Sequence, residues 1–246
     1  MVALEAIGVA VSFGGVRAVR GITLTVPPGE RRVIIGPNGA GKTTLFNLIA
    51  GQLRPSEGRV LFFGEDLTGE PPFRRTRRGL VRTFQISRLF KTLTVWENAL
   101  IAAQGVGGLS PRSFRMPGTE RNVTERIQML LTDWKLIDQH SALVQNISHG
   151  NQRLLEIVLA LATQPRLIML DEPTAGLSGG EREMVVAGLR GLPRDVTVIL
   201  TDHDMDVVFG IADRITVLNQ GEAIADGTPA EIERNAHVHE IYFGED

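Results

Sequence analysis

Residues 36–43 read Gly36-Pro37-Asn38-Gly39-Ala40-Gly41-Lys42-Thr43, and this stretch matches the phosphate-binding pattern G-x-x-x-x-G-K-[ST] at every position. Its glycines let the backbone bend so that N–H groups point at phosphate oxygens. Lys42 adds a full positive charge, and the Thr43 hydroxyl can bind the magnesium ion between two phosphates. The loop, with Thr44 after it, therefore predicts a bound nucleoside triphosphate.

Three apolar runs predict the sheet that carries this loop. Residues 33–35 lead directly into it, residues 167–170 end on Asp171, and residues 196–200 lead to His203. Runs that are apolar on both faces are typical of central strands in a parallel sheet covered by helices. In such sheets the chemistry lies beyond the carboxyl ends of the strands. The residues that follow each run are therefore the candidates for a site.

A helix should begin at Lys42 or Thr43, because apolar residues follow at helical spacing. The side chains expected to face inward are Leu45, Phe46, Leu48 and Ile49. The amino end of this helix would aim a partial positive charge at the bound phosphate.

The remaining segments predict the parts around this core. Residues 4–11, 22–26 and 60–63 indicate an antiparallel flank, and residues 215–225 indicate a hairpin. Helical spacing dominates residues 86–163, apart from an irregular Gly-, Ser- and Pro-rich loop. We therefore expect one α/β domain with a mostly parallel sheet, an antiparallel flank and an inserted helical subdomain. The expected division is a core of residues 1–85 and 164–236, a helical subdomain of residues 86–163, and a tail of residues 237–246.

Two adjacent carboxylates follow the second apolar run. Because neighbours on a strand point to opposite sides, Asp171 and Glu172 should have different roles. Asp171 can hold magnesium, and Glu172 can polarise the attacking water. His203, after the next strand, is interpreted as a donor to the γ-phosphate, and Gln85 as a ligand of the metal or of its water.

A second anion site is predicted where Ser148-His149-Gly150-Asn151 precedes an apolar helix. A small serine and a glycine at a helix start suit an anion. This segment has no lysine and no magnesium ligand of its own, as expected if it forms one half of a site that is completed by another segment.

The ordered set of motifs resembles the nucleotide-binding subunits of ABC transporters. In the terms of that family, these are Walker A at 36–43, the Q-loop at Gln85, the signature at 148–152, Walker B at 167–172 and the H-loop at His203. The resemblance implies the P-loop NTPase (RecA-like) fold, ATP and Mg²⁺ as cofactors, and ATPase activity in a head-to-tail dimer. It also implies that Phe13 stacks on the adenine and that Val19 lies against the ribose.

Two departures from the family pattern stand out. The signature is usually Leu-Ser-Gly-Gly-Gln, but here it reads Ile-Ser-His-Gly-Asn, so that His149 replaces a glycine. Conversely, residues 177–181 read Leu-Ser-Gly-Gly-Glu and look more like the signature. Because they follow Walker B, where the family has its D-loop, we interpret them as a look-alike.

The bulk properties argue against a disulfide-bonded, secreted or membrane-spanning protein. The formal net charge is −2, there is no cysteine, and no apolar run is long enough to cross a bilayer. A secretory signal is not expected at the N-terminus.

A basic run surrounds Gln85, and it can be a solvated face, a contact with a permease, or a contact with nucleic acid. No interleaved aromatic residues support nucleic acid, and we expect no such partner. The arginines of this run are Arg74, Arg75, Arg77, Arg78, Arg82 and Arg88.

Several local strings are similar to the ATPases of branched-chain amino acid importers. They include residues 82–85, 94–98, 171–177 and 202–205, and the 105–118 loop fits the larger ATPase of such a pair. The resemblance implies a subunit that powers import of branched-chain amino acids, or of urea, amides or aromatic acids. Its partners would be transmembrane permeases, a second ATPase subunit and a periplasmic or lipoprotein substrate-binding protein. Its place would be the cytoplasmic face of the bacterial inner membrane.

Other functions remain open at this point. An ATPase of lipopolysaccharide export shares much of the pattern, but its helical insertion is shorter. An ATPase of iron–sulfur assembly fits the length but not the local strings. A small-molecule kinase or GTPase is disfavoured because no Asn-Lys-x-Asp guanine-binding motif is present.

Overall fold

The computed structural model describes residues 1–83, 89–105 and 119–242. A six-stranded sheet forms its centre, in the order β10-β9-β3-β8-β7-β6. All neighbours are parallel except β9 and β10, which form the predicted hairpin. The strands are β3 (Arg31–Ile35), β6 (Leu80–Arg82), β7 (Leu167–Asp171), β8 (Thr197–Thr201), β9 (Arg214–Asn219) and β10 (Glu222–Gly227).

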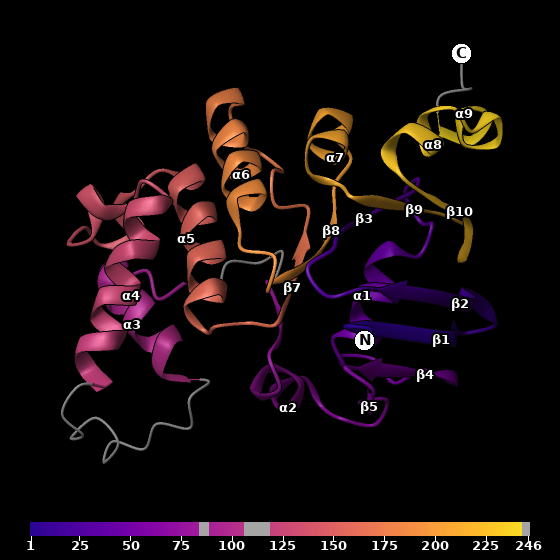
Figure 1. The fold of residues 1–246 in the computed structure, drawn as a ribbon, viewed down its shortest axis with the longest axis horizontal. Helices are drawn as coiled ribbons and strands as arrows, with labels where there is room; N and C mark the ends of the chain where they lie inside the picture. Colours follow the sequence, from indigo (N-terminus) through magenta and orange to yellow (C-terminus); the bar gives the residue numbers. More distant parts are fainter. Residues whose placement is uncertain (84–88, 106–118, 243–246) are drawn as a thin grey trace.

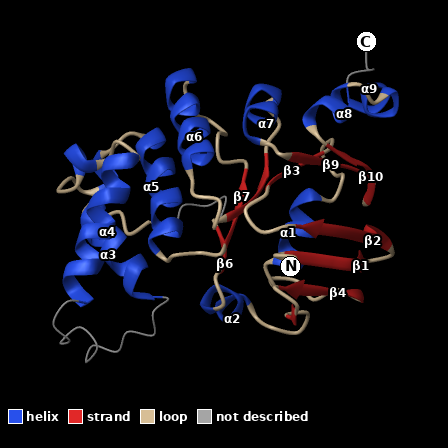
Figure 2. Ribbon diagram, in the orientation of Figure 1, coloured by secondary structure: helices blue, strands red, loops and turns tan. Residues whose placement is uncertain are grey.

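A second, antiparallel sheet has the order β2-β1-β4-β5 and forms the predicted flank. Figure 2 shows this sheet at the opposite end of the molecule from helices α3, α4 and α5. Its strands are β1 (Leu4–Phe13), β2 (Val16–Val26), β4 (Glu57–Phe62) and β5 (Glu65–Asp66).

Helices surround the six-stranded sheet, and α3, α4 and α5 pack on one another within the segment predicted to be helical (Figure 1). In the described part of the chain, no helix is both long and apolar enough to cross a membrane. Two short 3-10 helices cover Ile137–Gln139 and Val144–Asn146. The α-helices are α1 (Lys42–Ile49), α2 (Pro72–Arg77), α3 (Val95–Gly105), α4 (Thr119–Asp133), α5 (His149–Ala162), α6 (Gly179–Gly191), α7 (Met205–Ile211), α8 (Pro229–Glu233) and α9 (Ala236–Tyr242).

The apolar strands of the six-stranded sheet separate two hydrophobic cores. In β3, Val33 and Ile35 face a core that they share with helices α3 to α7, whereas Ile34 faces the core around α1. Successive side chains of a strand point to opposite faces, so a strand that is apolar throughout must be covered on both. The four predicted apolar residues of α1 are buried between the two sheets.

The carboxyl end of α1 is closed by a buried arginine, Arg75, which is 1% exposed. Its guanidinium donates hydrogen bonds to the carbonyl oxygens of Leu48 (3.1 Å), Ile49 (2.6 Å) and Leu67 (2.6 Å). A cation at this end complements the partial negative charge of the helix dipole. Burial lowers the pKa of Arg75 to about 10, so it stays charged at neutral pH.

The six arginines of the basic run therefore do not form one face. Arg75 is internal, and the side chain of Arg82 is only 8% exposed. Arg78 pairs with Glu65 and Glu70 at the surface. Arg74 and Arg77 are exposed on α2, and Arg88 lies outside the described residues.

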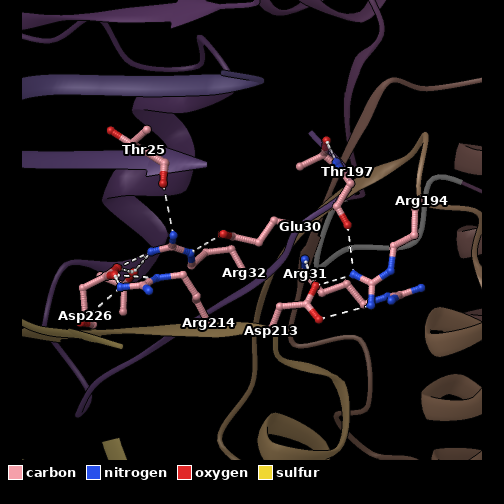
Figure 3. A network of polar contacts seen from close by, with 11 residues as sticks. Thr25, Glu30, Arg31, Arg32, Arg194, Thr197, Asp213, Arg214 and Asp226 are labelled. Atoms are coloured by element: carbon pink, nitrogen blue, oxygen red, sulfur yellow. Dashed lines mark hydrogen bonds and ion pairs between the residues drawn. The ribbon is translucent and has the colours of Figure 1, made fainter. Parts of the chain in front are cut away.

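A polar network joins the amino ends of β3 and β9 (Figure 3). It lies at the opposite end of β3 from the phosphate-binding loop, which follows Ile35. Asp226 pairs with Arg32 and accepts hydrogen bonds from Arg214 (2.5 Å) and Thr216 (2.7 Å). Arg32 also pairs with Glu30 at 2.7 Å. The network links β10 to β3 and β9 with balanced charges.

This network should give the protein an acid-sensitive contribution to stability. Burial raises the pKa of Asp226, but the hydrogen bonds from Thr216 and Arg214 and the charge of Arg32 outweigh it, and the net pKa is lowered. Such a group contributes stability above its unfolded pKa, about 3.9, and the contribution is lost as the pH falls through the folded-state value. We expect Asp226→Asn to lower the free energy of unfolding by about 1 kcal/mol at neutral pH, a figure kept small because the carboxylate is partly exposed.

Urea unfolding measured from neutral pH down to about pH 3 tests this expectation. The difference between Asp226→Asn and the unmodified protein should shrink below about pH 4. The exposed Asp195→Asn is the matched control and should show no such trend. A difference that is constant with pH would contradict the assignment.

Candidate functional site

The phosphate-binding loop connects β3 to α1, and two of its glycines are required by close contacts. A Cβ added to Gly36 would lie 2.3 Å from the carbonyl oxygen of Leu218, and one added to Gly41 would lie 2.7 Å from that of Ala18. Gly41 also has a φ of 101°, a backbone conformation that residues with a Cβ atom rarely adopt. The loop is therefore held from beneath by β2 and β9. Its backbone forms a cradle of the kind that binds phosphate.

Lys42 is the first residue of α1 and folds back over the loop. Its Nζ donates to the carbonyl oxygens of Gly36 (2.5 Å) and Pro37 (3.0 Å). Burial lowers the pKa of Lys42, while the charges of Glu172 and Asp171 oppose this shift. The ammonium thus contacts the loop, and the charges of the two carboxylates after β7 favour its protonated form.

Asp171 ends β7 and is 2% exposed. Its Oδ1 accepts a hydrogen bond from Thr201 Oγ1 (2.8 Å), and its Oδ2 accepts one from Arg82 Nη2 (2.8 Å). Neither partner was singled out from the sequence for this contact. An ionised carboxylate accepts about four hydrogen bonds, so Asp171 keeps lone pairs for a metal-bound water.

Glu172 is not part of the strand, which corrects the argument from strand alternation. Its φ is 48°, so a left-handed residue turns the chain and re-aims the side chain. The backbone N–H of Glu172 donates to Thr201 O (3.0 Å), and Arg153 of α5 donates to the carbonyl oxygens of Asp171 and Glu172 (2.9 Å each). The helix that follows the signature thereby contacts the Walker B turn.

His203 is exposed, and the residue before it orders its backbone. Asp202 accepts hydrogen bonds from the N–H groups of His203 (2.8 Å) and Asp204 (3.1 Å), and from Thr174 Oγ1 (2.6 Å). Asp202 is 2% exposed. Aspartate commonly orders a turn by accepting hydrogen bonds from the backbone N–H groups that follow it, so the sequence could have indicated this role of Asp202.

The other expected nucleotide contacts differ in placement. Phe13 is 49% exposed at the end of β1, which leaves a ring face available. Val19 is fully buried and lies beneath Gly41, so it supports the loop and offers no surface to a ribose in this conformation. Gln85 lies outside the described residues.

The signature segment forms the amino end of α5. Ser148 is the N-cap, and its Oγ accepts the N–H of Asn151 (3.1 Å). His149 is exposed, whereas Gly150 is buried so closely against Glu181 that a Cβ would lie 1.7 Å from Oε1. The look-alike at residues 177–181 is a helix start, because Ser178 and Glu181 form a capping box at α6.

A groove in the described part of the chain lies away from the phosphate-binding loop. It has a volume of about 1220 Å³ and lies between α4 and α6, with Arg126, Trp134 and Met184 among its lining residues. The loop instead offers a glycine-dependent backbone turn, which suits a phosphate.

The residues present fit a nucleotide with a metal ion. The glycine-dependent cradle suits the phosphates, and the exposed Thr43 hydroxyl and the Asp171 carboxylate are oxygen donors of the type that magnesium prefers. This cradle and the carboxylates of Asp171 and Glu172 meet at the carboxyl edge of the parallel strands.

Comparisons with known proteins agree with this arrangement. A family model described as "ABC transporter" matches residues 19–175, and one described as "Branched-chain amino acid ATP-binding cassette transporter" matches residues 224–246. The high-affinity branched-chain amino acid transport ATP-binding protein BraF of Pseudomonas aeruginosa is 40% identical over 252 residues, covering 98% of each chain. LivG of Escherichia coli, with the same description, is 40% identical over 97% of this chain and 96% of its own length.

A solved structure supports the same fold. It shows the ADP conformation of an ATP-binding cassette of an ABC transporter, is 34% identical, covers 100% of both chains, and superimposes with a TM-score of 0.86. The P-loop α/β fold and the resemblance inferred from the ordered motifs are confirmed. The chain therefore belongs to the ABC transporter family, in the group of the branched-chain amino acid transport ATP-binding proteins.

Proposed function

We propose that this chain binds ATP with magnesium and hydrolyses it to power an importer of branched-chain amino acids or of a related small solute, such as urea, an amide or an aromatic acid. The single observation that carries the proposal is that the glycine-dependent cradle after β3 and the carboxylates at the end of β7 lie at the same carboxyl edge of the parallel sheet. The names of the relatives at 40% identity support the solute class.

The proposed roles follow from position and residue chemistry. The backbone of residues 36–44 and Lys42 bind the phosphates, and Thr43, Asp171 and Gln85 hold the magnesium ion or its waters. A magnesium ion held by these residues would supply positive charge that offsets the negative charge of the phosphates. Glu172 accepts hydrogen bonding from the attacking water and polarises it, and His203 donates to the γ-phosphate.

A second ATPase subunit, identical or different, completes each site in this proposal. Ser148, His149, Gly150 and Asn151 lie at the amino end of α5 and carry no metal ligand. Their exposed edge suits the phosphate of a nucleotide held by the partner. Phe13 stacks on the adenine of the chain's own nucleotide, as its exposure permits.

Permease subunits are the proposed membrane partners, with a periplasmic or lipoprotein substrate-binding protein in the same complex. The chain then lies at the cytoplasmic face of the bacterial inner membrane. A docking surface is suggested by α2, where Phe73 is 58% exposed and lies 5.9 Å from the Arg77 guanidinium. An exposed aromatic ring beside cations suits a segment with apolar and acidic side chains.

Affinity capture of the tagged protein from detergent-solubilised host membranes tests this function. Mass spectrometry should identify two multi-spanning permeases and a second ATPase. Phe73→Asp should reduce permease capture at least several-fold without changing ATP binding, because the Phe73 side chain is exposed and lies outside the phosphate-binding loop. Met129→Asp, at a similarly exposed apolar residue on α4, is the matched control.

Other captured partners would overturn the transport assignment. Recovery of only soluble scaffold proteins, or of lipid-export components, would leave the ATPase chemistry standing without the importer. Equal capture by Phe73→Asp and the unmodified protein would place the docking surface elsewhere.

A further inference from the structure

The side chain of Arg82 contacts Asp171 but has no role in the mechanism proposed above. It ends β6 and its side chain is 8% exposed. Its Nη2 donates to Asp171 Oδ2 at 2.8 Å, and its Nη1 donates to Asn47 Oδ1 at 2.6 Å and to Gln52 Oε1 at 2.9 Å. Its guanidinium also lies 5.4 Å from the centre of the Phe46 ring. One side chain thus joins the Walker B strand to the helix of the phosphate-binding loop.

Resting on the proposed function, we propose that Arg82 is a positioning residue for the magnesium site. It fixes the carboxylate of Asp171 so that the lone pairs left free are presented to a metal-bound water. Asp171 itself is only 3% exposed in its side chain, so solvent gives it little help in keeping one orientation.

The geometry of the carboxylate carries this step. One oxygen of Asp171 is occupied by Thr201 and the other by Arg82, each at 2.8 Å. Two donors on opposite oxygens prevent rotation of the carboxylate plane, and each oxygen keeps one further acceptor site. Groups that orient a ligand of a metal in this way typically change metal affinity about 10- to 100-fold when removed.

The rest of Arg82 shows that its orientation is determined by these acceptors. The Nε atom of Arg82 is buried and has no hydrogen-bond partner among the described residues. A buried donor is seldom left unpaired unless the other contacts of the group outweigh it. The bridge to Asn47 and Gln52 therefore holds the guanidinium where it meets Asp171. Because the planar guanidinium reaches three acceptors at once, lysine should replace it only in part.

The test compares ATP affinity in the presence of magnesium with ATP affinity in EDTA, by equilibrium binding to the full chain. We expect Arg82→Met to reduce the affinity gained from magnesium about 10-fold, while affinity in EDTA stays within about two-fold. Arg82→Lys should recover only part of the gain. Arg78→Met, at the exposed and ion-paired arginine of the same run, should match the unmodified protein.

A second variant keeps the test valid if Arg82→Met fails to fold in a thermal melt. The double variant Asn47→Ala with Gln52→Ala removes the other two acceptors of Arg82 and should reduce the magnesium gain about three-fold. An unchanged gain in either variant overturns the proposal, as does equal weakening with and without magnesium. A full gain in Arg82→Lys would show that charge alone is sufficient and overturn the bridging geometry. If the unmodified protein gains nothing from magnesium, it is the proposed function that fails.

Discussion

The Glu172→Gln variant is expected to bind ATP with nearly unchanged affinity and to hydrolyse it about 10²- to 10³-fold more slowly. An amide has the shape of the carboxyl group but cannot accept a proton from the attacking water. The backbone at residue 172 should stay in place, because Thr201 and Arg153 hold its N–H and its carbonyl rather than its side chain. Loss of one negative charge beside Lys42 should not weaken the binding of an anion.

Phosphate release and equilibrium ATP binding, measured on the same preparation, test this prediction. Size-exclusion chromatography with ATP should show a closed dimer that accumulates. Lys42→Ala is the contrasting variant, and it should lose ATP binding itself, because the ammonium that folds over the loop is removed. Unchanged turnover in Glu172→Gln would remove Glu172 as the water-polarising group.

Arg75→Met is expected to lower the free energy of unfolding by about 3–4 kcal/mol, because several buried carbonyl oxygens lose their donor. The carbonyls of Leu48, Ile49 and Leu67 accept hydrogen bonds from the Arg75 guanidinium at 2.6–3.1 Å. The loss also removes the positive charge at the carboxyl end of α1. In a chain of this length such a change corresponds to a fall of about 10 °C in Tm.

Thermal and urea unfolding of Arg75→Met and of Arg74→Met form a matched pair. Arg74 is the exposed neighbour on the same helix, and its loss should change Tm by less than about 2 °C. Because Arg75 packs against the end of the phosphate-loop helix, ATP should partly restore the Tm of the variant by binding only the folded state. Equal effects of the two substitutions would show that burial at residue 75 does not determine stability.

Local sequence patterns were sufficient to predict the main elements around the phosphate-binding loop. The run at 33–35, the loop after it and the four apolar residues of α1 all have the predicted structure, and so does the hairpin of β9 and β10. These features depend on residues close together in the sequence, whose periodicity and turn chemistry are visible without the fold. The look-alike at 177–181 was also separated from the signature, and it caps α6.

Long-range contacts determined the rest. Adjacent arginines in one basic run differ in burial, since Arg75 is buried at the end of α1 and Arg74 is exposed. Val19 was expected at the ribose and is buried beneath Gly41 instead. Burial depends on which elements meet in three dimensions, and a one-dimensional charge pattern does not contain that information.

By itself, the sequence determined that this chain has a phosphate-binding loop, a parallel sheet that carries it, and the ordered motifs of its family. Only the tertiary structure decided how the carboxylates are held. The left-handed turn at Glu172 and the pairing of Asp171 with Arg82, 89 positions away, arise where β6, β7 and α1 pack together. The physical reason is that loop glycines act through local backbone freedom, whereas the orientation of a buried charge depends on donors brought from distant parts of the chain.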